Sequence, residues 1–220
     1  MKNVSKLLFV ILIGSLSLQT YAQKYGIKGG LNLSNQMWQE DGETLSSDFK
    51  MKPGFHIGGT YEHPISGPIS IQAGLIFKMK GLSMSEEYGS ESYTEKFTLY
   101  YLDIPVVVKA VVDVSSAVEI YGEVGPYLGM GLSGKSKWEY VSTGYTESDE
   151  EKVDWGSDPD NDHFKRPDFG LSIGGGVIIK GVQVGASYDL GLANISAYTE
   201  NGAKIKNRVL LITGVYWFGK

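Results

Sequence analysis

The sequence contains no cysteine among its 220 residues and only three histidines. Without cysteine the chain has no disulfide framework, and it cannot be a lipoprotein anchored through that residue. Acidic residues outnumber lysine and arginine, so the formal net charge is −5, and the basic residues form no cluster. A phosphate-binding surface needs such a cluster. The sequence therefore predicts no nucleic-acid partner.

Long apolar runs are also scarce. After residue 22 there is no run of about 18 or more apolar residues, which argues against a transmembrane helix in the mature chain. If this part of the chain crosses a membrane, it must cross as strands. Among strand structures, only closed barrels leave no backbone group unpaired in hydrocarbon.

The one extended apolar run lies at the N-terminus. It follows the charged start Met1–Lys6 and continues from Leu7 to Leu18. Ala22 then offers a small residue at the cut, and Thr20 a short one two positions before it. We therefore expect residues 1–22 to be a signal peptide cleaved before Gln23, with residues 23–220 forming one barrel domain. A buried N-terminal helix and an uncleaved anchor are the alternatives.

The sequence is rich in glycine, with 29 residues, and in tyrosine, with 14. Strict alternation of apolar and polar positions accompanies them and is clearest in Ile69–Lys80, where only Ile76 interrupts it. Alternation over about 9–11 residues is typical of transmembrane strands. Pro105 lies inside one such segment, which indicates an edge or a bulge. The eight segments are Tyr25–Ser34, Phe55–Glu62, Ile69–Lys80, Thr98–Val108, Val118–Leu132, Asp168–Ile179, Val182–Gly191 and Arg208–Phe218, the last with an open register because both its faces are apolar.

The connections between these segments alternate in length. Long connections follow the first, third, fifth and seventh segments, and short ones follow the others. Membrane barrels have short periplasmic turns and long external loops. We therefore predict an all-β fold, an eight-stranded antiparallel up-and-down transmembrane β-barrel with both termini in the periplasm. Within the longest connection, Ser133–Arg166, the segments Lys137–Val141 and Lys152–Trp155 suggest strand extensions, so a ten-stranded barrel stays open.

Five groups of residues carry a resemblance to a known family: Gly26–Asn32, Tyr101–Pro105 with Lys109, Gly125–Gly129, Asp168–Gly170 and Tyr188–Ile195. In these residues the chain resembles the PorT-like outer-membrane β-barrel family of Bacteroidetes, which is similar in architecture to OmpA and OmpX barrels. The resemblance covers nearly the whole mature sequence. It implies an outer-membrane location and a barrel architecture rather than an activity, although some relatives are linked to protein secretion and gliding.

Charged residues occupy the polar positions of the alternating segments and should face the lumen. An eight-stranded barrel is just wide enough for side chains to fill. Buried charges need partners, so we expect these residues to pair and close the tube; a proton or solute pathway is the alternative. They are Lys28, Glu62, Lys78, Lys80, Asp103, Lys109, Glu119, Glu123, Asp168 and Asp189.

Catalytic patterns are weak. Glu119 and Glu123 would lie about 13 Å apart along a strand, which is more than glycosidases use. No G-x-S-x-G elbow accompanies the histidines His56, His63 and His163, of which only the last falls in a predicted external loop. We therefore expect no enzymatic activity and no cofactor.

One loop motif is a weak candidate for a metal site. Asp158, Asp160 and Asp162 alternate like calcium ligands, but His163 and Phe169 stand where an EF-hand needs glycine and glutamate. A solvated acidic loop is the default interpretation. The alternative is a weak divalent-cation site that bridges lipopolysaccharide phosphates.

The leading hypothesis is a non-enzymatic integral outer-membrane protein with a role in envelope structure, adhesion or a secretion assembly. Its partners would be outer-membrane lipid and lipopolysaccharide, with a possible protein partner at the external loops. The aromatics Trp138, Tyr140, Tyr145 and Trp155 would form a contact surface there or pack within an extended hairpin. The alternative is a secreted, soluble, lipocalin-like barrel that binds a small apolar ligand. Alternation alone does not say which face points outward.

Overall fold

The computed structural model describes residues 23–44 and 49–218, so the predicted signal peptide lies outside the described residues. Eight antiparallel strands follow one another around a ring, and pairing of the last with the first closes it, from Tyr25↔Phe218 to Gln39↔Lys204. The predicted all-β, eight-stranded fold is confirmed. The ring strands are β1 (Lys24–Glu40), β4 (Lys52–Ser66), β5 (Ile69–Tyr88), β6 (Glu91–Ser115), β7 (Val118–Ser142), β9 (Pro167–Ile179), β10 (Val182–Gly191) and β11 (Lys204–Phe218).

Three short strands lie outside the ring: β2 (Glu43–Thr44), β3 (Phe49–Lys50) and β8 (Tyr145–Lys152). Of these, β8 pairs with β7 beyond the point where β9 leaves it, so β8 adds no strand to the ring. The ten-stranded alternative is therefore wrong. The 3₁₀ turn η2 (Glu200–Gly202) interrupts the connection between β10 and β11.

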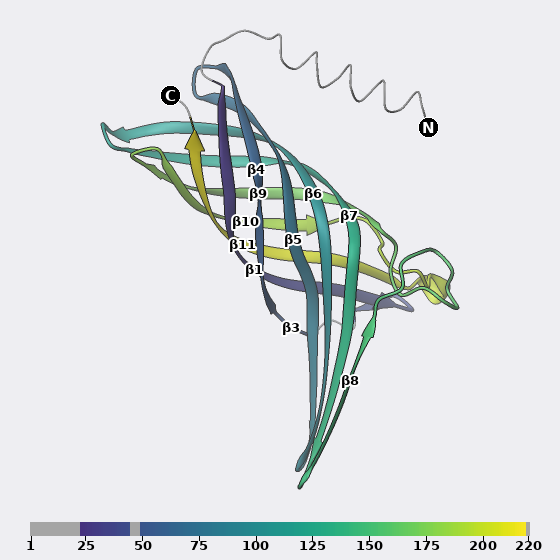
Figure 1. Cartoon of the computed structure of the whole chain (residues 1–220). Coiled ribbons are helices and arrows are strands. Elements are labelled where there is room, and N and C mark those ends of the chain that lie inside the picture. The colour runs from purple at the N-terminus through teal and green to yellow at the C-terminus, as the bar shows by residue number, and fades with distance from the viewer. Residues whose placement is uncertain (1–22, 45–48, 219–220) are drawn as a thin grey trace.

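The two ends of the barrel differ (Figure 1). At one end, which we call the turn end, residues 67–68, 116–117 and 180–181 connect successive strands, close to where β1 begins and β11 ends. Gly67 and Gly181 have positive φ values of 54° and 82°, which tight turns require and glycine adopts at little cost. The opposite end, the loop end, carries the longer connections.

The outward face of the barrel is apolar and the lumen is polar. Ile71 and Leu75 on β5 are 38% and 51% exposed, whereas Gln72 between them is 3% exposed. The predicted assignment of faces is confirmed. A lipocalin-like barrel needs the reverse arrangement, with an apolar interior and a solvated exterior, so the soluble alternative is excluded. In the described part of the chain, no helix has the length and apolar character needed to span a bilayer.

The structure also resolves the register of the last strand. Val209, Leu211 and Val215 of β11 face the lumen and are almost fully buried, while Ile212 and Tyr216 face outward. The strand is apolar on both faces because these three buried residues form an apolar patch on one wall of an otherwise polar lumen. Pro105 interrupts the β5–β6 ladder, but the register is the same on both sides of the gap and β6 also pairs with β7 at Pro105↔Tyr127. The predicted edge or bulge at Pro105 is therefore wrong: the missing N–H costs the ladder its pairing locally without shifting it.

Beyond the ring, four strands continue as a flat projection at the loop end (Figure 1). We call it the blade: residues 83–98 of the β5–β6 hairpin and 133–152 of the β7–β8 hairpin, in the order β5–β6–β7–β8. The prediction of a long loop between Lys80 and Thr98 was therefore wrong, because strand pairing runs to a turn at residues 89–90. Lys137–Val141 is strand as expected, but β8 ends at Lys152 and the chain then turns back into the barrel mouth.

Candidate functional site

The centre of the lumen is a layer of paired charges contributed by β5, β6, β9 and β10. Lys78 Nζ lies 2.9 Å from Asp103 Oδ2 and 2.5 Å from Asp189 Oδ2. Lys80 Nζ lies 3.1 Å from the same Asp103 oxygen and 2.8 Å from Asp168 Oδ2. All five side chains are at most 5% exposed. Because buried charges are stable only when paired, the four contacts hold the surrounding strands in one arrangement.

Aromatic rings and an amide complete this layer. Lys80 Nζ lies 4.4 Å from the centre of the Tyr101 ring and 4.8 Å from that of Tyr127, within reach of cation–π attraction. Asn207 Nδ2 donates to Asp168 Oδ2 at 3.0 Å. The layer therefore fills the width of the tube with side chains that contact one another.

A second group of charges lies nearer the turn end. Lys109 Nζ donates to Glu62 Oε2 and to Gln183 Oε1, both at 2.7 Å. Lys28 Nζ is 3.8 Å from Glu123 Oε1. These pairs connect β4 with β6 and β1 with β7, across the lumen rather than along it.

The predicted lumen residues are thus brought together with one exception. Glu119 is half-buried at the turn end, and within the described ranges no lysine or arginine nitrogen lies within 4.0 Å of it. Lys109 pairs instead with Glu62 of β4, which was also among the predicted lumen residues. The residues found in ion pairs are Lys28, Glu62, Lys78, Lys80, Asp103, Lys109, Glu123, Asp168 and Asp189.

Above the charged layer, an apolar cluster that no sequence pattern predicted fills the loop-end mouth. Trp155 packs edge-on against Tyr101 with ring centres 5.7 Å apart, and Phe164 packs edge-on against Phe97 at 5.6 Å. Trp155 therefore belongs neither to an exposed contact surface nor to the hairpin. The one signal in the sequence for this cluster was Phe164, a large apolar residue isolated in a polar stretch. The buried members are Leu82, Phe97, Leu99, Tyr101, Val153, Phe164, Ala193 and Ile195.

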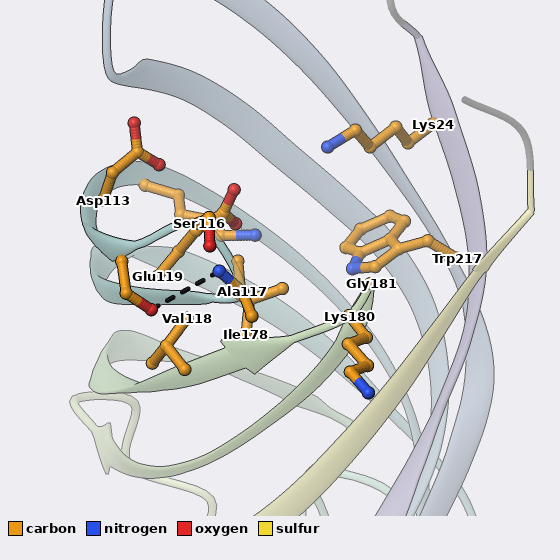
Figure 2. Close-up of a pocket in the computed structure, with 12 residues that line it drawn as sticks. Lys24, Asp113, Ser116, Ala117, Val118, Glu119, Ile178, Lys180, Gly181 and Trp217 are labelled. Atoms are coloured by element: carbon orange, nitrogen blue, oxygen red, sulfur yellow. Dashed lines mark hydrogen bonds between the residues drawn. The ribbon is translucent and has the colours of Figure 1, made fainter.

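The turn-end mouth is open. A cavity of about 800 Å³ lies there, lined by residues of the turns and of β1, β6, β7, β9 and β11. Figure 2 shows Lys24 and Trp217 on one side of this cavity and Asp113 with Glu119 on the other. We call this cavity the vestibule. Lys109, itself 1% exposed, also lines it, so the Lys109–Glu62 pair separates the vestibule from the lumen above.

The histidines do not form a catalytic arrangement. His56 is buried in the lumen between Asn32 and Thr213, with contacts of 2.6 and 3.1 Å. At the loop-end mouth His163 lies near Ser196, but Ser196 donates its hydroxyl to the carbonyl of Tyr198, and Nδ1 of His163 accepts the Asp154 amide at 3.1 Å. His63 lies on β4 and stacks on Tyr61.

The acidic turn at residues 158–162 satisfies its own carboxylates. Asp158 accepts hydrogen bonds from the Asn161 side chain at 2.8 Å and from the Asp160 amide at 3.1 Å. Asp162 accepts the Asp158 amide at 2.8 Å. These donors, the Asn161 side chain first, lower the pKa of Asp158. No group of three or more His, Asp or Glu side chains across the described residues is arranged to hold a metal ion, so Asp158, Asp160 and Asp162 do not converge on a common point.

Comparison with known protein families identifies one family whose sequence model matches most of the chain. The sequence model described as an outer membrane protein beta-barrel domain matches residues 21–197. No curated protein matches the chain.

Several solved structures have a similar course of the chain. Ail of Yersinia pestis is 17% identical with a TM-score of 0.36, and Neisserial surface protein A is 12% identical with a TM-score of 0.44; each match covers 90% of this chain and 100% of that protein. The outer membrane protease OmpT of Escherichia coli is 11% identical over 92% of this chain and 100% of its own, with a TM-score of 0.41. At these identities and scores, no activity transfers from these proteins to the chain.

Proposed function

Since the chain belongs to the family of outer membrane protein beta-barrel domains and is thus an integral protein of the outer membrane, we propose that it is a non-conducting, non-enzymatic barrel that acts through its loop end. That end faces the outside of the cell, and the turn end faces the periplasm. The role is in envelope structure, adhesion or a secretion assembly. Membership of the PorT-like family within this larger group is part of the proposal, as is contact with lipopolysaccharide.

The observation that carries the proposal is closure of the lumen at two successive levels. The layer around Asp103 fills the tube with paired charges, and the apolar cluster around Trp155 and Phe164 covers it on the loop side. Eight strands leave little interior space beyond that taken by side chains. A tube closed in this way is a scaffold, and the blade is the part of the chain that is free to meet a partner.

Among the described residues, the candidate groups lie apart from any catalytic arrangement, which supports the non-enzymatic part of the proposal. Ser196 is 4% exposed and its proton is committed to a backbone carbonyl, so His163 is not positioned to activate it. Glu119 and Glu123 belong to different surroundings, one in the open vestibule and the other beside Lys28.

The experiment tests orientation and closure together. Because the chain has no cysteine, Thr143→Cys in the β7–β8 turn and Ser116→Cys in the β6–β7 turn each supply a unique thiol. A membrane-impermeant maleimide should label Thr143→Cys in intact cells and should label Ser116→Cys only after the outer membrane is opened. The purified protein should give no stable currents in planar bilayers. Labelling of Ser116→Cys in intact cells, or large steady currents, would contradict the proposal.

A further inference from the structure

We propose that the blade docks an extended, lysine- or arginine-rich polypeptide segment, which adds to the free edge of β8 as a further strand. This inference rests on the proposed external orientation of the loop end and names the partner's chemistry. Three observations carry it: the separation of charge between the two faces of the blade, the aromatic residues on one of those faces, and the unpaired outer edge of β8.

The charges of the blade are sorted by face. In a sheet, residues paired across strands lie on the same face, and the face alternates along each strand. The register Glu86↔Tyr93↔Tyr140↔Glu147 and the next row, Met84↔Glu95↔Trp138↔Asp149, therefore define one face. This face carries six carboxylates and no lysine or arginine: Glu86, Glu91, Glu95, Glu147, Asp149 and Glu151.

The opposite face is mixed. It carries Glu87, Glu139 and Glu150 together with four lysines, and Lys135 Nζ lies 2.6 Å from Glu150 Oε1. Both faces are exposed to solvent beyond the barrel, so solubility does not account for placing every lysine of these rows on one side. The one-signed face produces a negative potential that attracts a cationic partner.

Aromatic rings lie among the carboxylates of the one-signed face. They are Tyr88, Tyr93, Trp138, Tyr140 and Tyr145. Tyr88 is 68% exposed and Tyr145 is 55% exposed, and their hydroxyls donate to Glu86 at 2.8 Å and to Glu147 at 2.9 Å. Rings beside carboxylates offer cation–π contacts as well as ion pairs, which suits lysine and arginine side chains.

The edge of β8 supplies the means of docking. All eight residues of β8 are exposed, and β8 pairs with β7 on one side while no described strand lies on the other. An exposed edge is a template for strand addition, which recognises the partner backbone through hydrogen bonds and its alternate side chains through the face. Glu147, Asp149 and Glu151 point to the same face at intervals of about 6.8 Å, so an added strand with a basic residue at every second position would meet each of them.

Two other occupants fit this surface less well. A second copy of β8 would bring carboxylates directly opposite carboxylates, and like charges across strands destabilise pairing. A divalent cation needs several oxygens at about 2.3–2.6 Å, but these side chains are spaced along a strand, and the described residues contain no group of three or more placed to hold a metal.

The test uses the full chain in detergent and a short blocked peptide in which lysine alternates with threonine, compared with a peptide of the same composition whose lysines are consecutive. The alternating peptide should bind about tenfold more tightly, because it places every lysine on one face. Its affinity should fall as salt is added. Hydrogen exchange of β8 amides should slow when it binds, an effect that loose charge attraction would not produce.

Two triple variants provide a matched comparison. Glu147→Gln/Asp149→Asn/Glu151→Gln and Glu87→Gln/Glu139→Gln/Glu150→Gln remove the same charge from opposite faces. The first should lose about tenfold in affinity and the second less than about twofold. Equal losses, absence of binding at low salt, binding without protection of β8, or displacement by calcium at constant ionic strength would each overturn the inference. None of these results affects the labelling and conductance tests, so the two proposals can fail separately.

Discussion

At the scale of the single residue, Lys80 shows how the lumen keeps its charges. Its side chain is fully buried and contacts both Asp103 and Asp168, whereas Lys135 pairs with Glu150 with 51% of its side chain exposed. Removing one member of a buried pair leaves uncompensated charge and costs about 3–5 kcal/mol. An exposed pair is worth about 0–1 kcal/mol.

We therefore expect Lys80→Met to lower the free energy of unfolding by about 3–5 kcal/mol and Lys135→Met by less than about 1 kcal/mol. The measurement is urea unfolding in lipid vesicles, followed by tryptophan fluorescence. Equal stability of the two variants would show that the central layer does not depend on its ion pairs.

A second residue-scale prediction concerns the faces of β5. Lysine at Ile71 or Leu75 places a charge on the outward surface, at a cost of about 2–4 kcal/mol near the bilayer midplane. Lysine at Gln72 faces a polar lumen opposite Glu62. Folding into vesicles, measured as the heat-modifiable fraction on gels, should fall sharply for Ile71→Lys and Leu75→Lys and little for Gln72→Lys. Similar yields from all three variants would contradict the assignment of the membrane surface.

At the scale of the element, the acidic turn at residues 158–162 gives a pH prediction. The pKa of Asp158 is lowered by its hydrogen bonds, so the carboxylate form stabilises the turn above the unfolded pKa, and this stabilisation is lost as the pH falls through the lower folded pKa. The turn should thus stay ordered down to about pH 4 and loosen below it.

The amide proton of Asp160, which donates to Asp158 Oδ1, reports this transition in an NMR titration. Its shift should move with a midpoint below that of an ordinary aspartate, and the movement should disappear in Asp158→Asn. A midpoint at or above the ordinary value would show that the turn does not depend on the ionised carboxylate.

At the scale of the whole molecule, closure of the ring depends on the seam between β1 and β11. A Cβ at Gly30 would collide with the carbonyl oxygen of Ile212 across this seam, and a Cβ at Gly59 on the neighbouring β4 would meet nothing within 4 Å. The seam needs a residue without a side chain at Gly30 because the two backbones approach closely there.

Gly30→Val should therefore reduce the heat-modifiable, closed form on gels, whereas Gly59→Val should leave it unchanged. The comparison is matched because both substitutions add the same side chain to adjacent strands of one wall. Normal closure of Gly30→Val would mean that the seam accommodates the added atoms by moving.

The sequence by itself determined the eight alternating segments of the ring, which side chains face outward, and the end at which the short turns lie, but it left a ten-stranded ring open. These features follow from the alternation of side chains along each strand. In a membrane barrel every second side chain faces apolar lipid and the others face a narrow polar interior, so each strand must satisfy the pattern locally. It also indicated which charges enter the lumen, because residues such as Lys78 and Asp189 occupy the inward positions of clear alternations.

Only the tertiary structure decided which of those charges meet, since Lys78 and Asp189 are 111 residues apart in the chain and the curvature of the closed ring brings them together. It also determined the positions of Trp155 and Phe164, which fill the loop-end mouth because the chain after β8 folds back over it. The blade was missed for a different reason. Away from the barrel mouth both of its faces lie in water, so residues 83–96 need no alternation of apolar and polar side chains. Their strand structure comes from the pairing of β5 with β6 and of β6 with β7 rather than from any pattern of their own.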